Sequence, residues 1–205
     1  MTDHAISRQQ FSVLGLAFLC SGAAGLIYQV AWQRLLFANF GVDLISVCII
    51  VSTFMLGLGL GALAGGWLGD RFPAATLKFF VLCEVVIGLF GLASPWLIRA
   101  FGVWFNDASF AVSGLANFLL MLIPTFFMGA TLPVLIAHLV RVWHNVGAAT
   151  GHLYALNTLG AMLGCSLTAF WLFNRIELDQ AIQLAAAINF TVAAVVGASF
   201  KGATK

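Results

Sequence analysis

The sequence has very few charged residues, which make up 8% of its 205 positions. Soluble domains carry about 25%. Apolar residues make up 62% of the chain, and the mean hydropathy is +1.05. Such a chain cannot cover a water-facing surface with polar groups, so we expect an integral membrane protein. The net charge is only +2 and the sequence has no basic patch, so we expect no nucleic-acid partner.

The sequence also lacks grouped metal or redox ligands. Its four cysteines lie far apart, each in a different apolar segment: Cys20, Cys48, Cys83 and Cys165. This spacing excludes a CxxC motif, so we expect buried, small hydrophobic side chains. The histidines show no three-ligand arrangement, so we expect no metal and no cofactor.

Long apolar runs dominate the chain. A membrane span needs about 20 mostly apolar residues. Six segments qualify: 11–37, 44–69, 77–98, 113–139, 147–173 and 180–200. We therefore expect an all-α, polytopic protein of six transmembrane helices, with residues 1–205 forming a single domain in the lipid bilayer. The first run is too long for a signal peptide, so we expect it to stay as an uncleaved span.

Basic residues are unevenly divided between the two predicted sides. With a cytoplasmic N-terminus, the inner segments hold Arg8, Arg71, Lys78, Arg141, Lys201 and Lys205, and the outer ones hold Arg34, Arg99 and Arg175. The positive-inside rule then predicts a multi-pass protein of a bacterial-type inner membrane, with both termini cytoplasmic.

The spacing of the spans suggests an internal repeat. A shift of 104 residues places the first three spans on the last three, and WLGDR at 67–71 on WLFNR at 171–175. Three helices per repeat would give the two halves opposite orientations, as in a 3+3 inverted repeat.

The first span ends in a stretch rich in polar and aromatic residues, GLIYQVAWQRLLF at 25–37. Tyr28, Gln29 and Trp32 share one helical face with Gly25. Two interpretations remain open. Either Tyr28 and Trp32 form an aromatic belt at the membrane surface, or Tyr28 and Gln29 line an external vestibule that binds a substrate.

Glu84 is the one acidic residue within a predicted span, about 10 Å from the cytoplasmic edge. A charge in mid-membrane is costly, so such an acid is a candidate functional residue. Glu84 shares a face with Gly88, Gly91 and Pro95, which directs it into the bundle. Either it binds a cation or amine or carries a proton, or it is a protonated glutamate hydrogen-bonded between helices.

The fourth span contains two prolines, in LIPTFFMGATLPVL at 122–135. Pro124 and Pro133 each remove a backbone hydrogen bond, and Gly129 lies between them. We expect a kinked or broken helix, in which Thr131 satisfies part of the freed backbone. Breaks of this kind often build substrate sites in transporters, although plain kinks are also common in membrane helices.

Glycines on two spans favour close helix packing. The second span has a stripe of four: Gly57, Gly61, Gly65 and Gly69. The fifth has a GxxxG pair, Gly160 and Gly164, near Tyr154 and Asn157. Small residues let membrane helices approach closely. Asn157 would either hydrogen-bond across helices as a structural contact or join Tyr154 in a substrate site.

Five motifs occur in order along the chain: FLCSGAAGLIYQVAWQRLLF, FMLGLGLGALAGGWLGDR, CEVVIGLFGLASP, IPTFFMGATLPVL and GHLYALNTLGAMLG. Together they resemble the membrane domain of spermidine synthase-like membrane proteins, a family of fused major-facilitator and spermidine-synthase proteins. The resemblance covers nearly the whole chain and implies a six-helix module like half of a major facilitator.

The resemblance also implies a soluble aminopropyltransferase-like domain after the membrane domain. The 205 residues contain no Gly-rich strand-to-helix loop and no pair of catalytic aspartates. We therefore expect that this chain is not an enzyme. We expect a separate aminopropyltransferase-like partner on the cytoplasmic side.

These observations lead to two hypotheses on function. In the first, the module binds or transports a small polar solute, and the resemblance suggests a polyamine or related amine. Glu84 would supply the counter-charge, with Tyr28, Gln29, Asn157 and the broken fourth span around it. In the second, the chain is a non-catalytic membrane anchor or structural subunit for a soluble enzyme or a larger membrane complex. A six-helix transporter would also require a homodimer, whereas an anchor would not.

Overall fold

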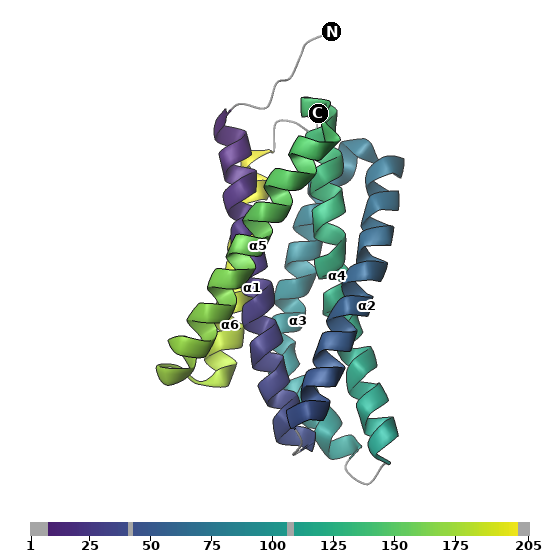
Figure 1. Ribbon diagram of the computed structural model, residues 1–205, viewed down its shortest axis with the longest axis vertical. Helices are drawn as coiled ribbons and strands as arrows, with labels where there is room; N and C mark the ends of the chain where they lie inside the picture. The colour runs from purple at the N-terminus through teal and green to yellow at the C-terminus, as the bar shows by residue number, and fades with distance from the viewer. Residues whose placement is uncertain (1–7, 41–42, 106–108, 201–205) are drawn as a thin grey trace.

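The computed structural model describes residues 8–40, 43–105 and 109–200, which form six long α-helices joined by short connections (Figure 1). The helices are α1 Arg8–Phe40, α2 Asp43–Arg71, α3 Thr76–Trp104, α4 Phe110–Trp143, α5 Val146–Phe170 and α6 Leu178–Ser199. Two 3₁₀ turns follow α2 and α5, namely η1 Pro73–Ala75 and η2 Leu172–Asn174. The described residues contain no strand, and all six helices are long and apolar enough to cross a membrane. The predicted fold class is therefore confirmed.

The helices extend beyond the predicted spans at most of their ends. The largest difference is in α3, which continues to Trp104 through Pro95, past the predicted end at 98. Hydropathy marks only the part of a helix that lies in hydrocarbon. Tryptophan and arginine are favoured in the interfacial layer, where a helix can continue without being strongly apolar.

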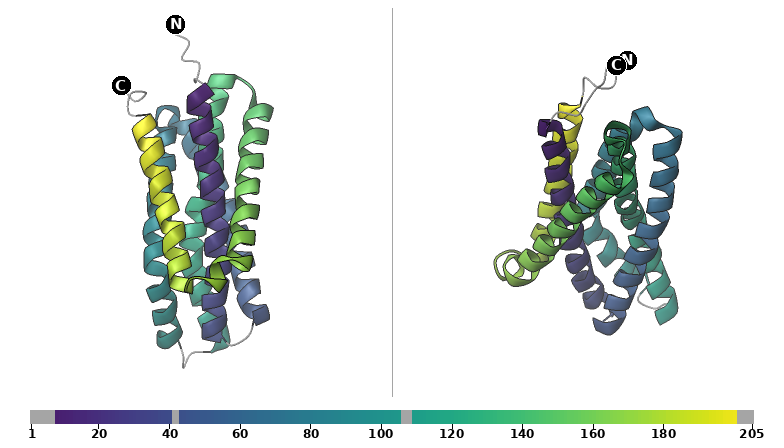
Figure 2. Two further views of the ribbon diagram at one scale, coloured as in Figure 1. Left: turned by 90° about the vertical axis from the view of Figure 1, so that its left-hand side faces the viewer. Right: turned by 45° about the horizontal axis from the view of Figure 1, so that its top comes forward.

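The start of α1 and the end of α6 lie at the same end of the bundle (Figure 2), as an even number of spans requires. The connections from α2 to α3 and from α4 to α5 lie at this end as well. The basic residues of the described segments divide between the two ends: Arg8, Arg71, Lys78 and Arg141 lie at the end where α1 begins, and Arg34, Arg99 and Arg175 at the other. Lys201 and Lys205 lie outside the described residues.

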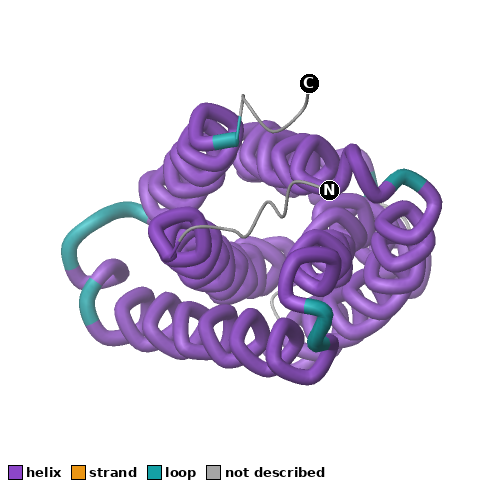
Figure 3. Tube along the Cα trace, turned by 90° about the horizontal axis from the view of Figure 1, so that it is seen from above, coloured by secondary structure: helices purple, strands orange, loops and turns teal. Residues whose placement is uncertain are grey.

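Large apolar side chains cover much of the outer surface. Leu63 and Trp67 of α2 are 74% and 63% exposed, and Phe170 of α5 is 81% exposed. Lipid tails are as apolar as these side chains, so they can solvate this surface. The two helices that carry them, α2 and α5, are the least buried of the six spans. Seen along the bundle axis (Figure 3), α5 lies at the periphery of the bundle.

α4 is one continuous helix, so the break expected at Pro124, Gly129 and Pro133 is wrong, and the alternative of a kink stays a prediction. Both prolines lie inside the helix. A Cβ atom added at Gly129 would lie 2.4 Å from the Leu58 carbonyl oxygen of α2. Gly129 therefore allows a close approach of two helices, and packing along α2 supports the helical path that the prolines weaken.

The helix contacts come in matched pairs. α2 packs along α4, and α1 packs along α5. α3 packs on α4, and α6 packs on α1. If α1, α2 and α3 are exchanged with α4, α5 and α6, the α2–α4 contact becomes the α5–α1 contact, and the α3–α4 contact becomes the α6–α1 contact. The α3–α6 contact is unchanged by this exchange. A 3+3 inverted repeat would have this pattern.

Individual contacts in the α2–α4 and α1–α5 interfaces also match, with the same residue spacing. In the α2–α4 interface, Gly61 contacts Phe126, Gly65 contacts Ala130, and Gly129 contacts Leu58. The matching contacts in the α1–α5 interface are, in the same order, Gly160 with Leu19, Gly164 with Ala23, and Gly22 with Asn157. A Cβ atom at Gly61 or Gly160 would lie 1.9 Å from the partner's carbonyl oxygen. Only glycine fits at this distance, where Cα–H groups can contact carbonyl oxygens. The rest of the α2 stripe, Gly57 and Gly69, also lies against α4.

Two arginines occupy equivalent places at opposite ends of the bundle. Arg141, near the end of α4, donates a hydrogen bond to the Pro73 carbonyl of η1. Arg34, near the end of α1, lies 4.2 Å from the centre of the Phe173 ring of η2. Each arginine thus contacts the 3₁₀ turn of the other half. These matched contacts favour the predicted inverted repeat.

Candidate functional site

A buried polar cluster joins α1, α3 and α6. Glu84 of α3 is fully buried. Ser21 Oγ of α1 donates a hydrogen bond to Glu84 Oε1 at 2.6 Å, and Asn189 Nδ2 of α6 donates one to Glu84 Oε2 at 2.7 Å. Asn189 is 1% exposed. Because the three residues come from three helices, the cluster exists only in the folded bundle.

The cluster lies deep within the membrane spans. Asn189 is near the middle of α6 (Leu178–Ser199), about 15 Å from either end at the α-helical rise per residue. Ser21 is near the middle of the first span, Phe11–Ala38. A carboxyl group at this depth is costly unless its oxygens are hydrogen-bonded. Ser21 and Asn189 supply those bonds from the two neighbouring helices.

The cluster has spare hydrogen-bond acceptors. Asn189 Oδ1 is buried and has no hydrogen-bond partner among the described residues. An ionised carboxylate has about four acceptor sites, and the two bonds to Glu84 occupy two of them. The groups without partners are therefore acceptors. This arrangement suits a ligand that carries several N–H donors and a positive charge.

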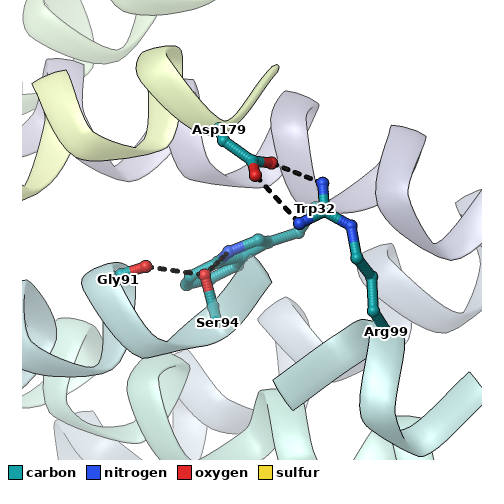
Figure 4. A network of polar contacts seen from close by, with 5 residues as sticks. All are labelled: Trp32, Gly91, Ser94, Arg99 and Asp179. Atoms are coloured by element: carbon teal, nitrogen blue, oxygen red, sulfur yellow. Dashed lines mark hydrogen bonds and ion pairs between the residues drawn. The ribbon is translucent and has the colours of Figure 1, made fainter. Parts of the chain in front are cut away.

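Tyr28 and Trp32 are buried in the bundle, which corrects both interpretations of residues 25–37. Both side chains have 0% exposure, and their rings stack with centroids 4.8 Å apart. Trp32 Nε1 donates to Ser94 Oγ at 2.8 Å, and Ser94 Oγ donates to the Gly91 carbonyl at 2.8 Å (Figure 4). Neither aromatic residue faces the membrane surface or an open vestibule.

Tyr28 of α1 packs against the face of α3 that carries Glu84. A Cβ atom at Gly91 would lie 2.2 Å from Tyr28 Oη. Gly91 is two helical turns from Glu84, about 10 Å along the axis. Tyr28 Oη is buried and has no partner in the described part of the chain. Tyr28 is thus close to the cluster without being bonded to it.

The other predicted substrate-binding residues do not join the cluster. Asn157 packs on α1, where a Cβ atom at Gly22 would lie 2.6 Å from Asn157 Oδ1. Tyr154 is 60% exposed on the outer face of α5. Thr131 donates to a carbonyl one turn earlier in its own helix, at 2.7 Å. Gln29 is half-buried. Asn157 and Tyr154 lie on α5, which contributes no residue to the cluster.

Two members of the cluster, Ser21 and Asn189, were not among the predicted site residues. Both are single polar residues in long apolar runs, separated from Glu84 by 63 and 105 positions. The predicted repeat contained a signal for Asn189, since the shift of 104 residues carries Glu84 to within one position of it. Ser21 had no comparable signal, because serine is common in membrane helices as a packing residue.

The cysteines differ from the prediction that all four are buried. Cys83 is buried, whereas Cys20 and Cys48 are exposed on the outside of the bundle. A thiol tolerates contact with lipid because it behaves as a small hydrophobic group. In the described part of the chain, no group of three or more His, Cys, Asp or Glu residues could hold a metal ion.

The end of the bundle opposite the termini has a second link between α3 and α6. The Arg99 guanidinium donates two hydrogen bonds to the Asp179 carboxylate, at 2.8 and 2.6 Å (Figure 4). These side chains are 55% and 34% exposed. α3 and α6 are therefore joined both at their buried middle, through Glu84, and at this end.

Comparison with known proteins shows weak homology to polyamine aminopropyltransferases. The chain is 29% identical over 200 residues to polyamine aminopropyltransferase of Corynebacterium efficiens, which covers 94% of the chain and 36% of that protein. It is 27% and 28% identical to polyamine aminopropyltransferases 1 and 2 of Streptomyces coelicolor, covering 79% and 93% of the chain but 29% and 33% of those proteins. No family model and no solved structure matches the chain.

These relatives contradict the expectation that the protein is not an enzyme, because all three are named as enzymes. The expectation relied on catalytic motifs that these 205 residues lack. The chain spans about a third of the length of the relatives it matches. Motifs missing from that third are therefore no evidence against enzyme activity.

Proposed function

We propose that this chain is a polyamine-related membrane module that binds a protonated aliphatic amine at Glu84. The observation that supports this most directly is the buried carboxyl group beside an amide oxygen, Asn189 Oδ1, that has no partner among the described residues. A buried acceptor without a partner costs about 1–3 kcal/mol, and a ligand N–H group would remove that cost.

The chemistry of the cluster matches an ammonium group. An ammonium has three N–H donors and no acceptor. It would replace the hydroxyl of Ser21 or the amide of Asn189 as a donor to Glu84, and donate to Asn189 Oδ1. The two charges would then neutralise each other in a medium where either alone is costly. The relatives' name includes the word polyamine, which suggests that the amine is a polyamine.

Spermidine binding to the purified protein tests this proposal. We expect the wild type to bind and Glu84→Gln to bind at least about tenfold more weakly, because a neutral amide loses the charge-assisted hydrogen bond. Glu177→Gln is the matched control, since it makes the same change at an exposed acid outside the cluster, and the glutamine can still accept the capping hydrogen bond of α6. Equal binding by wild type and Glu84→Gln would overturn the proposal. Transport is a further part of it, to be tested as spermidine uptake by proteoliposomes.

A second candidate function is membrane attachment of an aminopropyl-transfer activity. Three proteins named polyamine aminopropyltransferase support this candidate. Each aligns with 79–94% of this chain, over about a third of its own length. The transfer itself would require residues beyond those that form the bundle. Purification of the tagged protein from its native host, with an aminopropyl-transfer assay on the product, tests it. A product without that activity would contradict this candidate.

We also propose that both ends of the bundle's chain face the cytoplasm. Among the described residues, Arg8, Arg71, Lys78 and Arg141 lie at the end of the bundle where α1 begins and α6 ends, against Arg34, Arg99 and Arg175 at the other end. This excess agrees with the positive-inside rule. A green fluorescent protein joined after Lys205 should fluoresce, and an alkaline phosphatase joined there should be inactive. The reverse pattern would contradict this orientation.

A further inference from the structure

A cleft of about 550 Å³ lies between α2, α4 and the start of α5, at the end of the bundle that carries the termini. Its size is within the range of small-molecule sites, about 300–1,000 Å³. Of the predicted site residues, Gly69 and Pro133 line the cleft, and no residue of the Glu84 cluster does. The cleft is thus separate from the proposed amine site.

Two opposite charges line this cleft without pairing with each other. Asp70, near the end of α2, and Arg141, near the end of α4, are both exposed. The ion pair found in the described residues is elsewhere, between Arg99 and Asp179. Arg141 donates one hydrogen bond to the Pro73 carbonyl, but a guanidinium has five N–H donors. Both charges therefore remain available to a ligand.

The rest of the lining is mainly aliphatic, with Ile136, Val140 and Val146 among it. At Gly66, a Cβ atom would meet nothing within 4 Å, so this part of the cleft wall is open. Trp67, the residue after Gly66 in α2, is 63% exposed on the lipid-facing surface. A matching ligand would combine one negative charge, one positive charge and an apolar body reaching into the lipid.

We propose that this cleft binds a phospholipid with an ethanolamine headgroup. The phosphate would accept hydrogen bonds from Arg141, and the primary ammonium would donate to the Asp70 carboxylate. The acyl chains would follow the apolar wall toward the exposed face of α2. Each charged group of the headgroup thus has one partner of opposite charge in the cleft.

The same residues disfavour other ligands. A choline headgroup has no N–H donor for Asp70, and its quaternary ammonium is usually recognised by aromatic side chains, whereas this lining is aliphatic. An anionic glycerol headgroup would meet Arg141 but also the negative charge of Asp70. A free polyamine would meet the positive charge of Arg141.

Native mass spectrometry of the full chain in mild detergent can test the proposal. Equal amounts of phosphatidylethanolamine, phosphatidylcholine and phosphatidylglycerol with identical acyl chains would be added to delipidated protein. The variants are Asp70→Asn and Arg141→Gln. Arg71→Gln is the control, since Arg71 is exposed at the same end but does not line the cleft. Melting temperatures would verify that all variants remain folded.

We expect the wild type and Arg71→Gln to retain the ethanolamine lipid preferentially. Arg141→Gln should retain it roughly tenfold less, the loss expected for one charge-assisted hydrogen bond. Asp70→Asn should lose the preference for ethanolamine over choline while still binding lipid. Equal retention of all three lipids by the wild type, preference for the glycerol lipid, or an unchanged preference in Asp70→Asn would each overturn the proposal.

Discussion

Replacing Gly61 by alanine should destabilise the bundle, whereas the same change at Gly59 should not. A Cβ atom at Gly61 would lie 1.9 Å from the Phe126 carbonyl oxygen, and the next nearest atoms, at 2.9 and 3.0 Å, are also backbone atoms of α4. No side chain can rotate away, so the two helices must separate. A Cβ atom at Gly59 would meet nothing within 4 Å.

The expected difference follows from these two environments. Overpacking at a close contact costs about 1–3 kcal/mol. Alanine at an open helical position gains about 0.5–1 kcal/mol over glycine. The two variants should therefore differ in free energy of unfolding by about 1.5–4 kcal/mol. On the scaling for chains of this size, the melting temperature of Gly61→Ala should fall by about 2–12 °C.

Thermal unfolding in mild detergent, followed by tryptophan fluorescence, measures this difference. The counterpart pair on α5 extends the test, since a Cβ atom at Gly160 would lie 1.9 Å from the Leu19 carbonyl oxygen and one at Gly151 would meet nothing within 4 Å. If the two halves are equivalent, Gly160→Ala should lower the melting temperature about as much as Gly61→Ala. Equal stability of Gly61→Ala and Gly59→Ala would refute the reasoning.

Three further substitutions test the buried contacts and the ion pair. Tyr28→Phe should leave the melting temperature unchanged or raise it, because the hydroxyl has no partner among the described residues; a fall equivalent to more than about 1 kcal/mol would contradict this. Trp32→Phe should lower stability by at least about 0.5–1.5 kcal/mol, because it removes the hydrogen bond to Ser94, and unchanged unfolding would count against that bond. Asp179→Asn should cost less than about 1 kcal/mol, because its pair with Arg99 is partly exposed. That cost should shrink further in 1 M salt, where screening acts over about 3 Å, and an effect that is large and insensitive to salt would contradict this account.

The fold could be predicted from composition because the bilayer allows few alternatives. A long apolar run in lipid must satisfy its own backbone hydrogen bonds, and a helix does so within one segment. The helix ends were less predictable, as the continuation of α3 to Trp104 shows. The break expected in α4 was wrong because a proline removes a local bond, whereas the path of the helix also depends on how closely α2 approaches Gly129.

The candidate site could be predicted only in part. Glu84 was recognisable by itself, because an acid in an apolar run is unusual. Its partners Ser21 and Asn189 were not, since hydrogen bonds between helices depend on which faces meet. Tyr28 was expected in a surface belt or in an external vestibule because of its position along the first span, whereas its full burial follows from the neighbouring helices. Tyr154 shares α5 with Asn157, yet it points outward.

Spermidine binding to the wild type, Glu84→Gln and Glu177→Gln, measured by titration calorimetry in the same detergent, tests the central claim most directly. The proposed function predicts binding by the wild type and Glu177→Gln, and binding at least about tenfold weaker in Glu84→Gln. Glutamine can keep a hydrogen bond with Ser21, so that variant should remain folded. Binding unchanged in a folded Glu84→Gln, or no binding by the wild type, would contradict the assignment of an amine site to this cluster.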